Sequence, residues 1–155
     1  MLFRKARMSD IETMAALINF YAEKGEMLHR TIPSMYQKIR EYTLVENDRT
    51  IVAVGGLHIL WNDLAEICSL AVHPEKINTG LGSSLVKKLI QEGRALGIEK
   101  IFALTYQPLF FEKCGFTRID KDELPQKVWT ECINCPKFPN CDEIALIQNI
   151  NHSTS

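Results

Sequence analysis

Apolar residues recur at two spacings along the chain, one typical of helices and one typical of strands. Residues 2–6 suit a short strand, and Ser9 or Asp10 then caps a helix. The apolar face of this helix is formed at helical spacing by Ile11, Met14, Ala15, Leu17 and Ile18. Gly25 ends this unit. Pro33 suits the first turn of a second, shorter helix, whose apolar face carries Met35, Ile39 and Tyr42.

A run of strands follows. Residues 42–46 and 50–60 flank Asn47-Asp48-Arg49, a turn sequence that favours a hairpin. A second turn at 61–63 leads into a third strand, residues 64–72, which ends at His73-Pro74. Together these runs predict a hairpin meander.

A glycine-containing loop, residues 77–82, opens a further helix. Leu81, Leu85, Leu89 and Leu96 mark its buried face, and Gly97 is its C-cap. The remaining elements are expected at 100–105 (strand), 108–113 (short helix), 116–119 (strand) and 142–147 (strand). We therefore predict a single mixed α/β domain over residues 1–150, followed by a frayed tail at 151–155.

Composition and charge narrow the classes of function. The chain has 155 residues, 46% of them hydrophobic and 24% charged, as in an ordinary soluble domain. Eighteen Lys and Arg against nineteen Asp and Glu give a net charge of -1, which disfavours a nucleic-acid binder or a protein of anionic membranes. The N-terminus has no secretory signal, and no run approaches the roughly 18 apolar residues of a membrane span. We therefore expect a cytoplasmic protein with neither nucleic acid nor a membrane as partner.

The loop at 77–82 carries the first chemical signal. A helix N-terminus has unpaired N–H groups and a positive dipole end, so it suits a pyrophosphate. Gly80 and Gly82 lack side chains and would let phosphate oxygens approach the backbone amides. A plain turn at the start of a helix explains the same glycines, so both interpretations stay open on this feature alone. The loop lacks the glycine spacing of a dinucleotide fold, and no Gly-Lys-Ser/Thr marks a nucleotide P-loop.

The order of the motifs resembles the GNAT superfamily of acyl-CoA-dependent N-acetyltransferases. The matching residues are Leu70-Ala71-Val72-His73-Pro74, then Gly80-Leu81-Gly82 at the start of a helix, then Phe110-Phe111-Glu112-Lys113-Cys114-Gly115-Phe116. The resemblance implies a mixed, largely antiparallel central sheet flanked by helices, with acetyl-CoA bound at a strand-loop-helix and no metal required. The cofactor-binding residues that it implies are Leu70, Ala71, Val72, Ile77, Asn78, Thr79, Gly80, Leu81, Gly82 and Ser83. Dimers are frequent in the superfamily, so a homodimer is one expected assembly.

A narrower resemblance is to the short, kinase-less N-acetylglutamate synthases of arginine biosynthesis. It rests on five blocks, at residues 26–30, 63–67, 104–108, 124–129 and 135–143. It implies that the acetyl group passes directly from acetyl-CoA to the α-amine of L-glutamate, within a ternary complex of the enzyme and both substrates. Arg30 and Lys127, which lie in two of these blocks, would then bind the two carboxylates of glutamate. For each of them a solvated surface cation is the alternative.

Two further residues receive candidate catalytic roles. Glu66, on the strand that leads to the cofactor loop, would accept the proton of the attacking ammonium, directly or through a water. A plain cross-strand carboxylate is its alternative. Tyr106, at a strand end, could help the thiol to leave, although a half-buried structural tyrosine explains it equally. His58 falls inside an apolar strand and is interpreted as a hydrogen-bonded core or cross-strand histidine, and no catalytic role is assigned to it or to His29 and His73.

Three positions depart from the family pattern. Ile77 stands where Gln or Arg is usual, and Asn78 replaces a frequent Gly. The implied pyrophosphate contacts are mainly backbone, so we expect cofactor binding to survive. Phe111 stands where many relatives carry a tyrosine that protonates the leaving thiolate, so the resemblance assigns no residue to that role.

These departures keep a non-catalytic acyl-CoA-binding module as an alternative to an enzyme. Within the same fold, a second alternative is an acetyltransferase for another small amine or for a protein N-terminus. Cys132, Cys135 and Cys141 cluster near the end of the chain, but structural zinc takes four ligands, so reduced structural thiols are favoured over a metal or redox site.

Overall fold

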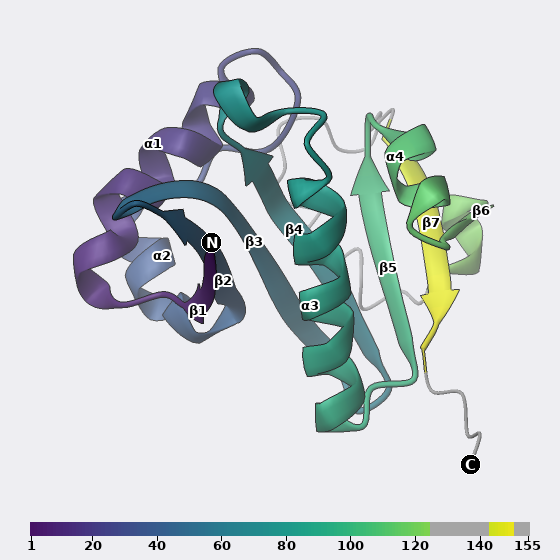
Figure 1. Cartoon of the computed structure of the whole chain (residues 1–155). Helices are drawn as coiled ribbons and strands as arrows, with labels where there is room; N and C mark the ends of the chain where they lie inside the picture. The colour runs from purple at the N-terminus through teal and green to yellow at the C-terminus, as the bar shows by residue number, and fades with distance from the viewer. Residues whose placement is uncertain (125–142, 151–155) are drawn as a thin grey trace.

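The protein is described by a computed structural model over residues 1–124 and 143–150 (Figure 1). Within these ranges the chain forms one seven-stranded sheet in the order β1-β2-β3-β4-β5-β7-β6. Neighbouring strands are antiparallel except for the pair β4–β5, which is parallel. The strands are β1 (Leu2–Lys5), β2 (Tyr42–Asn47), β3 (Thr50–Trp61), β4 (Leu64–Val72), β5 (Lys100–Thr105), β6 (Thr117–Ile119) and β7 (Ile144–Asn149). The mixed, largely antiparallel sheet predicted from the sequence is confirmed.

Helices cover both faces of the sheet. The α-helices are α1 (Ile11–Ala22), α2 (Ile32–Gln37), α3 (Leu81–Leu96) and α4 (Pro108–Lys113), and short 3₁₀ turns lie at η1 (Met8–Asp10), η2 (Ile39–Glu41), η3 (Pro74–Lys76) and η4 (Lys121–Glu123). One buried cluster joins Met14 of α1 and Met35 of α2 to Leu44 of the sheet. A second cluster packs Leu85 of α3 and Phe111 of α4 against the other face. The sheet is therefore buried on both sides, and α3 lies across it (Figure 1).

Two predicted helical details are wrong. The second helix was expected to carry Ile39 and Tyr42, but α2 ends at Gln37 because Lys38 leaves helical geometry, with φ −104° and ψ 20°. The chain then makes the turn η2, and Tyr42 begins β2 opposite Gly56. Leu96, expected on the buried face of α3, is 61% exposed, since it occupies the last helical position, beyond the turn that packs on the sheet. Gly97 is the C-cap, as predicted, with φ 86°.

The last strand begins later than the sequence predicts. It was expected at 142–147, whereas β7 is Ile144–Asn149 and pairs with β5 along its whole length. The register with β5 runs from Lys100↔Asn149 to Thr105↔Ile144, so the position of β7 is set by its neighbour rather than by its own pattern.

A β-bulge bends the centre of the sheet. The register between β3 and β4 shifts between Val54 and Gly56, and on the opposite strand Ser69 has a left-handed φ of 53°. A positive φ at a residue other than glycine costs free energy and persists where its surroundings hold it. Gly55 lies opposite the bulge, and a Cβ there would stand 3.0 Å from Leu70 Cδ1 and 3.2 Å from Leu89 Cδ1. A side chain at this position would therefore have to displace the ends of Leu70 and Leu89 by a few tenths of an ångström.

Strands β4 and β5 pair over only three residues. The parallel register runs from Leu64↔Lys100 to Glu66↔Phe102 and stops, although β4 continues to Val72 and β5 to Thr105. Figure 1 shows the two strands diverging beyond this point, above the start of α3. Among the described residues, the second half of β4 thus has no strand partner on its β5 side.

An ion-pair network fixes the N-terminal edge strand. Arg4 of β1 donates to both carboxylate oxygens of Asp10, at 2.8 and 3.0 Å, and to Glu46 of β2 at 2.9 Å. The backbone N–H of Arg7 donates to the same Asp10 carboxylate at 2.7 Å. Asp10 precedes α1, so the network ties the first strand, the first helix and β2 together. The hydrogen bond from Arg4 is the main cause that lowers the pKa of Asp10.

We expect Asp10→Asn to lower the free energy of unfolding by about 1–3 kcal/mol at neutral pH, because Arg4 loses its charged, buried partner. A lowered pKa in the folded state means that this stabilisation is full above the ordinary carboxyl pKa of about 4 and is lost as the pH falls below it. Urea unfolding across the acid range measures both effects. Glu12→Gln, which removes an exposed carboxylate from the first turn of α1, is the control. Equal acid sensitivity of wild type and Asp10→Asn would contradict the assignment.

Candidate active site

The loop predicted to bind the cofactor ends at an open helix N-terminus. Gly80 is the N-cap of α3 and has a left-handed φ of 84°. No side chain of the described residues caps the helix, and the first intrahelical bond runs from the Ser84 N–H to the Gly80 carbonyl. The amides of Leu81, Gly82 and Ser83 therefore lie in the first turn, where backbone N–H groups have no helical acceptor. Such a turn suits an anionic ligand.

The loop before the helix is held by its own polar groups. The Thr79 hydroxyl donates to the Lys76 carbonyl at 2.6 Å, and the Glu75 N–H donates to His73 Nδ1 at 3.2 Å. Asn78 adopts a left-handed φ of 65°, a conformation that asparagine tolerates better than most residues. This explains how Asn78 stands where the family pattern has a frequent glycine. Ile77 is 49% exposed, and its aliphatic side chain has no polar atom that could contact the loop.

Aromatic rings support the first turn of α3 from below. A Cβ on Gly82 would stand 3.2 Å from Phe110 Cε1 and 3.5 Å from Val72 Cγ2, so this glycine allows close packing of α3 on α4 and β4. Phe111 is buried and makes edge-to-face contacts with Phe110 and Phe116, with ring centroids 5.1 and 5.3 Å apart. Phe111 is therefore a core residue, consistent with the absence of a hydroxyl at this position.

The open half of β4 leads directly to this loop. Leu70, Ala71 and Val72 lie on the part of β4 that β5 does not pair. The hydroxyl of Tyr21, on α1, donates to the carbonyl of Val72 and so holds the end of the strand. The structure thus brings together the strand, loop and helix residues that the sequence predicts as the cofactor site.

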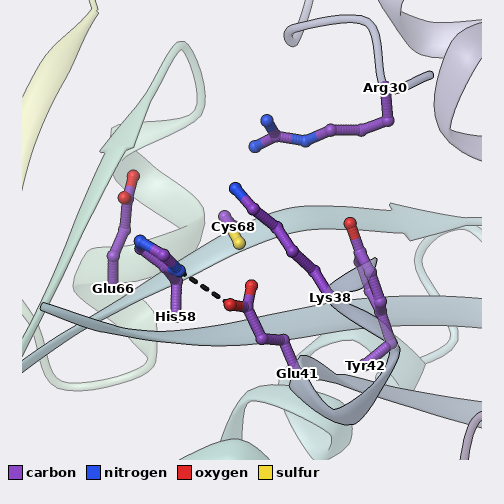
Figure 2. Close-up of a pocket in the computed structure, with 7 residues that line it drawn as sticks. All are labelled: Arg30, Lys38, Glu41, Tyr42, His58, Glu66 and Cys68. Atoms are coloured by element: carbon purple, nitrogen blue, oxygen red, sulfur yellow. Dashed lines mark hydrogen bonds and ion pairs between the residues drawn. The ribbon is translucent and has the colours of Figure 1, made fainter. Parts of the chain in front are cut away.

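A polar pocket opens on the sheet beside β4 (Figure 2). Its lining comes from the loop after α1, the end of α2, η2 and strands β2, β3 and β4. The lining residues are Arg30, Lys38, Glu41, Tyr42, His58, Glu66 and Cys68. Two carboxylates and two cations thus share one small site with a histidine. An arrangement of this kind can bind a zwitterion and move a proton.

Arg30 is positioned from both sides. Its backbone N–H donates to Asn19 Oδ1 at 3.0 Å, and Asn19 Nδ2 donates back to the Arg30 carbonyl at 3.1 Å. Its Nε donates to the hydroxyl of Ser69, the bulge residue of β4, at 3.0 Å. These bonds leave the terminal nitrogens of the guanidinium directed over the pocket, as Figure 2 shows.

Glu66 lines the same pocket, opposite a histidine. It is the cross-strand partner of His58, and the Nδ1 of His58 lies 2.8 Å from Glu41 Oε2. The predicted hydrogen bonding of His58 is confirmed, but its place in the pocket was not foreseen. Arg30 and Glu66 were predicted from the sequence as site residues, and the structure places both in one pocket. The prediction missed Lys38, Glu41, Tyr42, His58 and Cys68.

One other predicted site residue lies outside this pocket. Tyr106 is half-buried, follows the last residue of β5 and does not line this pocket. It stands at the end where β5 has parted from β4. Lys127 and the cysteines Cys132, Cys135 and Cys141 lie outside the described residues. Within the described part of the chain, no group of three or more His, Cys, Asp or Glu side chains is arranged to hold a metal ion.

Two titratable groups of the pocket are electrically neutral near pH 7. Burial raises the pKa of the Cys68 thiol to about 12, and the nearby Glu66 carboxylate contributes in the same direction. Burial likewise raises the pKa of Tyr42 to about 12. A thiol is a nucleophile only as its thiolate, so Cys68 is unsuited to carrying an acetyl group.

Known proteins are similar to this chain over most of its length. The acetyltransferase (GNAT) family matches residues 10–116, and the chain belongs to that family. An uncharacterized N-acetyltransferase of Chlorobaculum tepidum is 34% identical over 147 residues, 95% of each chain. An amino-acid acetyltransferase of Mycobacterium tuberculosis is 34% identical over 131 residues, which cover 83% of this chain and 75% of that protein.

A solved structure adds the cofactor. N-acetylglutamate synthase from Neisseria gonorrhoeae, complexed with coenzyme A and N-acetyl-glutamate, aligns with a TM-score of 0.88 at 28% identity, over 96% of this chain and 35% of that one. The chain is therefore an N-acetyltransferase with acetyl-CoA as its cosubstrate. None of the helices in the two described stretches has the length and apolarity needed to cross a membrane.

Replacing the N-cap glycine tests the cofactor loop. Gly80→Ala forces a side chain into the left-handed region at a cost of about 1–2 kcal/mol and displaces the first amides of α3, so we expect the Kd for CoA to rise about tenfold by calorimetry. Gly97→Ala is a matched control at the other end of the same helix, since Gly97 also has a positive φ and no atom lies within 4 Å of the place its Cβ would take. Both variants lose stability, and only Gly80→Ala loses affinity. Equal affinity of Gly80→Ala and Gly97→Ala for CoA would contradict the assignment of this loop to the cofactor site.

The neutral Cys68 thiol predicts transfer without an acetyl-enzyme. We expect Cys68→Ser to keep kcat within a factor of about 3, and intact-mass spectrometry of wild type with acetyl-CoA alone to show no acetylated protein. Initial velocities should give intersecting lines when both substrates are varied. Parallel lines together with an acetylated Cys68 peptide would contradict this prediction.

Proposed function

We propose that the protein transfers acetyl from acetyl-CoA to the α-amine of L-glutamate, the N-acetylglutamate synthase reaction of arginine biosynthesis. Relatives named amino-acid acetyltransferase support an amino-acid acceptor. The synthase whose structure aligns with this chain binds N-acetyl-glutamate. We place this reaction in the cytoplasm, with small molecules rather than nucleic acid or membrane as partners and a homodimer as the expected assembly.

The observation that carries the proposal is the pair of cations in the pocket of Glu66. Arg30 and Lys38 both line it, and glutamate brings two carboxylates that need fixed positive charges. Arg30 is held by Asn19 and Ser69, so its fork is preorganised and little side-chain entropy is lost on binding. Lys127 remains proposed as a further cation for the same substrate.

The cofactor side is proposed to act through the backbone. Residues 77–83 would hold the pyrophosphate at the N-terminus of α3. The open half of β4, at Leu70, Ala71 and Val72, would pair with the pantetheine arm and direct an N–H at the thioester oxygen. Such a preorganised donor stabilises the oxyanion that forms when the amine attacks the acetyl carbon.

Proton transfer completes the proposed reaction. Glu66 would accept the proton of the ammonium, directly or through a water, and the free amine would form the new C–N bond as the C–S bond breaks. The CoA thiol leaves with an intrinsic pKa of about 8.5, judged by free cysteine, so it needs modest help. Tyr106, at the β5 side of the parted strands, is proposed to give that help.

A kinetic comparison tests the acceptor. Release of the CoA thiol is measured with L-glutamate and, beside it, with L-glutamine, L-aspartate, L-ornithine and a short peptide. We expect glutamate to be preferred, and Arg30→Ala to raise the KM for glutamate about 10- to 100-fold while the KM for acetyl-CoA stays unchanged. Arg40→Ala, which removes an arginine of η2 that does not line the pocket, should change neither constant.

Other outcomes would change the assignment in defined ways. A preference for another amine would overturn the glutamate acceptor and keep the fold and cosubstrate. Tight CoA binding with no thiol release for any amine would favour a binding module over an enzyme.

A further inference from the structure

One interaction in the pocket has no part in the reaction described above. The Nδ1 of His58 lies 2.8 Å from Glu41 Oε2, and the two side chains are only 18% and 22% exposed. They come from different elements, since His58 lies on β3 and Glu41 ends the turn η2. A carboxylate and an imidazole brought together inside a polar pocket are a common device for moving protons.

The contact with Glu41 determines which nitrogen of His58 can accept a proton. In a neutral imidazole that donates Nδ1–H to a carboxylate, the other ring nitrogen, Nε2, carries the lone pair. Figure 2 shows this second nitrogen on the side of Glu66. His58 and Glu66 are cross-strand partners on adjacent strands, a position that brings side chains on one face within contact of each other.

A proton must leave this region in every catalytic cycle. If Glu66 takes it from the acceptor's ammonium, Glu66 becomes a carboxylic acid and has to be ionised again before the next amine can react. We propose that His58 and Glu41 form a proton relay that returns Glu66 to its carboxylate. The Nε2 of His58 takes the proton from Glu66, Glu41 stabilises the imidazolium, and the same nitrogen releases the proton to solvent. The relay rests on the proposed role of Glu66 but not on glutamate as the acceptor.

The charged groups around His58 affect its uptake of a proton in opposite directions. The carboxylates of Glu41, on η2, and Glu66, on β4, favour the imidazolium. The cations Arg30, on the loop after α1, and Lys38, at the end of α2, disfavour it. Tyr42 and Cys68 are uncharged near pH 7 because both have pKa values of about 12. Glu41 is the carboxylate that touches the ring, so its charge has the largest influence on proton uptake.

The distinguishing variant is Glu41→Gln. Its side-chain oxygen can still accept the hydrogen bond from His58 Nδ1–H, so the contact between η2 and β3 is kept and only the charge is lost. We expect kcat to fall about tenfold, with the KM for acetyl-CoA unchanged. The acidic limb of the kcat–pH profile should move to lower pH, because His58 without the adjacent charge binds a proton less readily.

A second variant removes the ring. His58→Gln should lower kcat about 10- to 100-fold, and free imidazole added to the assay should restore part of the loss. Glu112→Gln, which breaks the exposed 3.1 Å ion pair between α4 and Arg118 of β6, is the control and should leave kcat and its pH profile unchanged. Thermal unfolding of each variant verifies that it folds. If His58→Gln fails to fold, the kcat and pH profile of Glu41→Gln alone test the relay.

The assays use whichever amine the wild type acetylates best. A wild-type kcat and pH profile in Glu41→Gln, with no imidazole rescue in His58→Gln, would make the pair a structural contact between η2 and β3 and overturn the relay. Preference of the wild type for an amine other than glutamate would overturn the acceptor assignment while the relay was tested with that amine.

Discussion

The separation of β4 from β5 is the feature on which the rest of the structure depends. The two strands share a parallel register for three residues, up to Glu66↔Phe102, and then diverge. The bulge at Ser69, with Gly55 packed closely beneath Leu70, bends β4 at this level of the sheet. The half of β4 that has no strand partner on its β5 side ends at the loop that opens α3, so the open strand edge and the first amides of the helix follow one another closely along the chain. Continuous pairing of β4 with β5 would have satisfied the backbone N–H and C=O groups of the strand within the sheet.

A single helix, α1, supports both parts of the proposed site. Asn19 of α1 holds the backbone of Arg30, and Tyr21, two residues later, holds the carbonyl of Val72 at the end of β4. Arg30 in turn donates to Ser69 of the bulge. The pocket of Arg30 and Glu66 and the open half of β4 are therefore linked through short, directional hydrogen bonds. Amine attack on a thioester needs this kind of fixed relative placement.

The sequence was a good guide to elements and to local chemistry. Strands 64–72 and 100–105 and helix 108–113 were predicted with the bounds that the structure has, because clear apolar patterns and flanking Pro or Gly residues define them. The glycine loop could be found because an αL N-cap and a close helix contact both require glycine. Arg30 and Glu66 were predicted as site residues mostly from the resemblance to the short N-acetylglutamate synthases. Leu96 was misjudged because helical spacing does not reveal where the sheet beneath a helix ends.

The contact between His58 and Glu41 could not be predicted, since it depends on strand register and on where a helix ends. Trp61 pairs with Leu64, and a regular hairpin would continue this register to place Ile59 opposite Glu66. A shift between Ile59 and Trp61 puts His58 there instead, and a slip of one residue exchanges the two faces of a strand. Glu41 reaches His58 only because α2 stops at Gln37 and the chain tightens into η2. Neither event leaves a signal in the spacing of apolar residues.

Hydrogen–deuterium exchange with and without CoA tests most directly whether the open half of β4 and the start of α3 form the cofactor site. Bound CoA should slow amide exchange within residues 67–72 and at 80–83, because the N–H groups of β4 that face away from β3 and those of the first turn of α3 would gain acceptors. Exchange in β7, which is fully paired with β5, should stay unchanged. Slower exchange confined to other segments, with residues 67–72 and 80–83 unaffected, would contradict the proposed role of the parted strands.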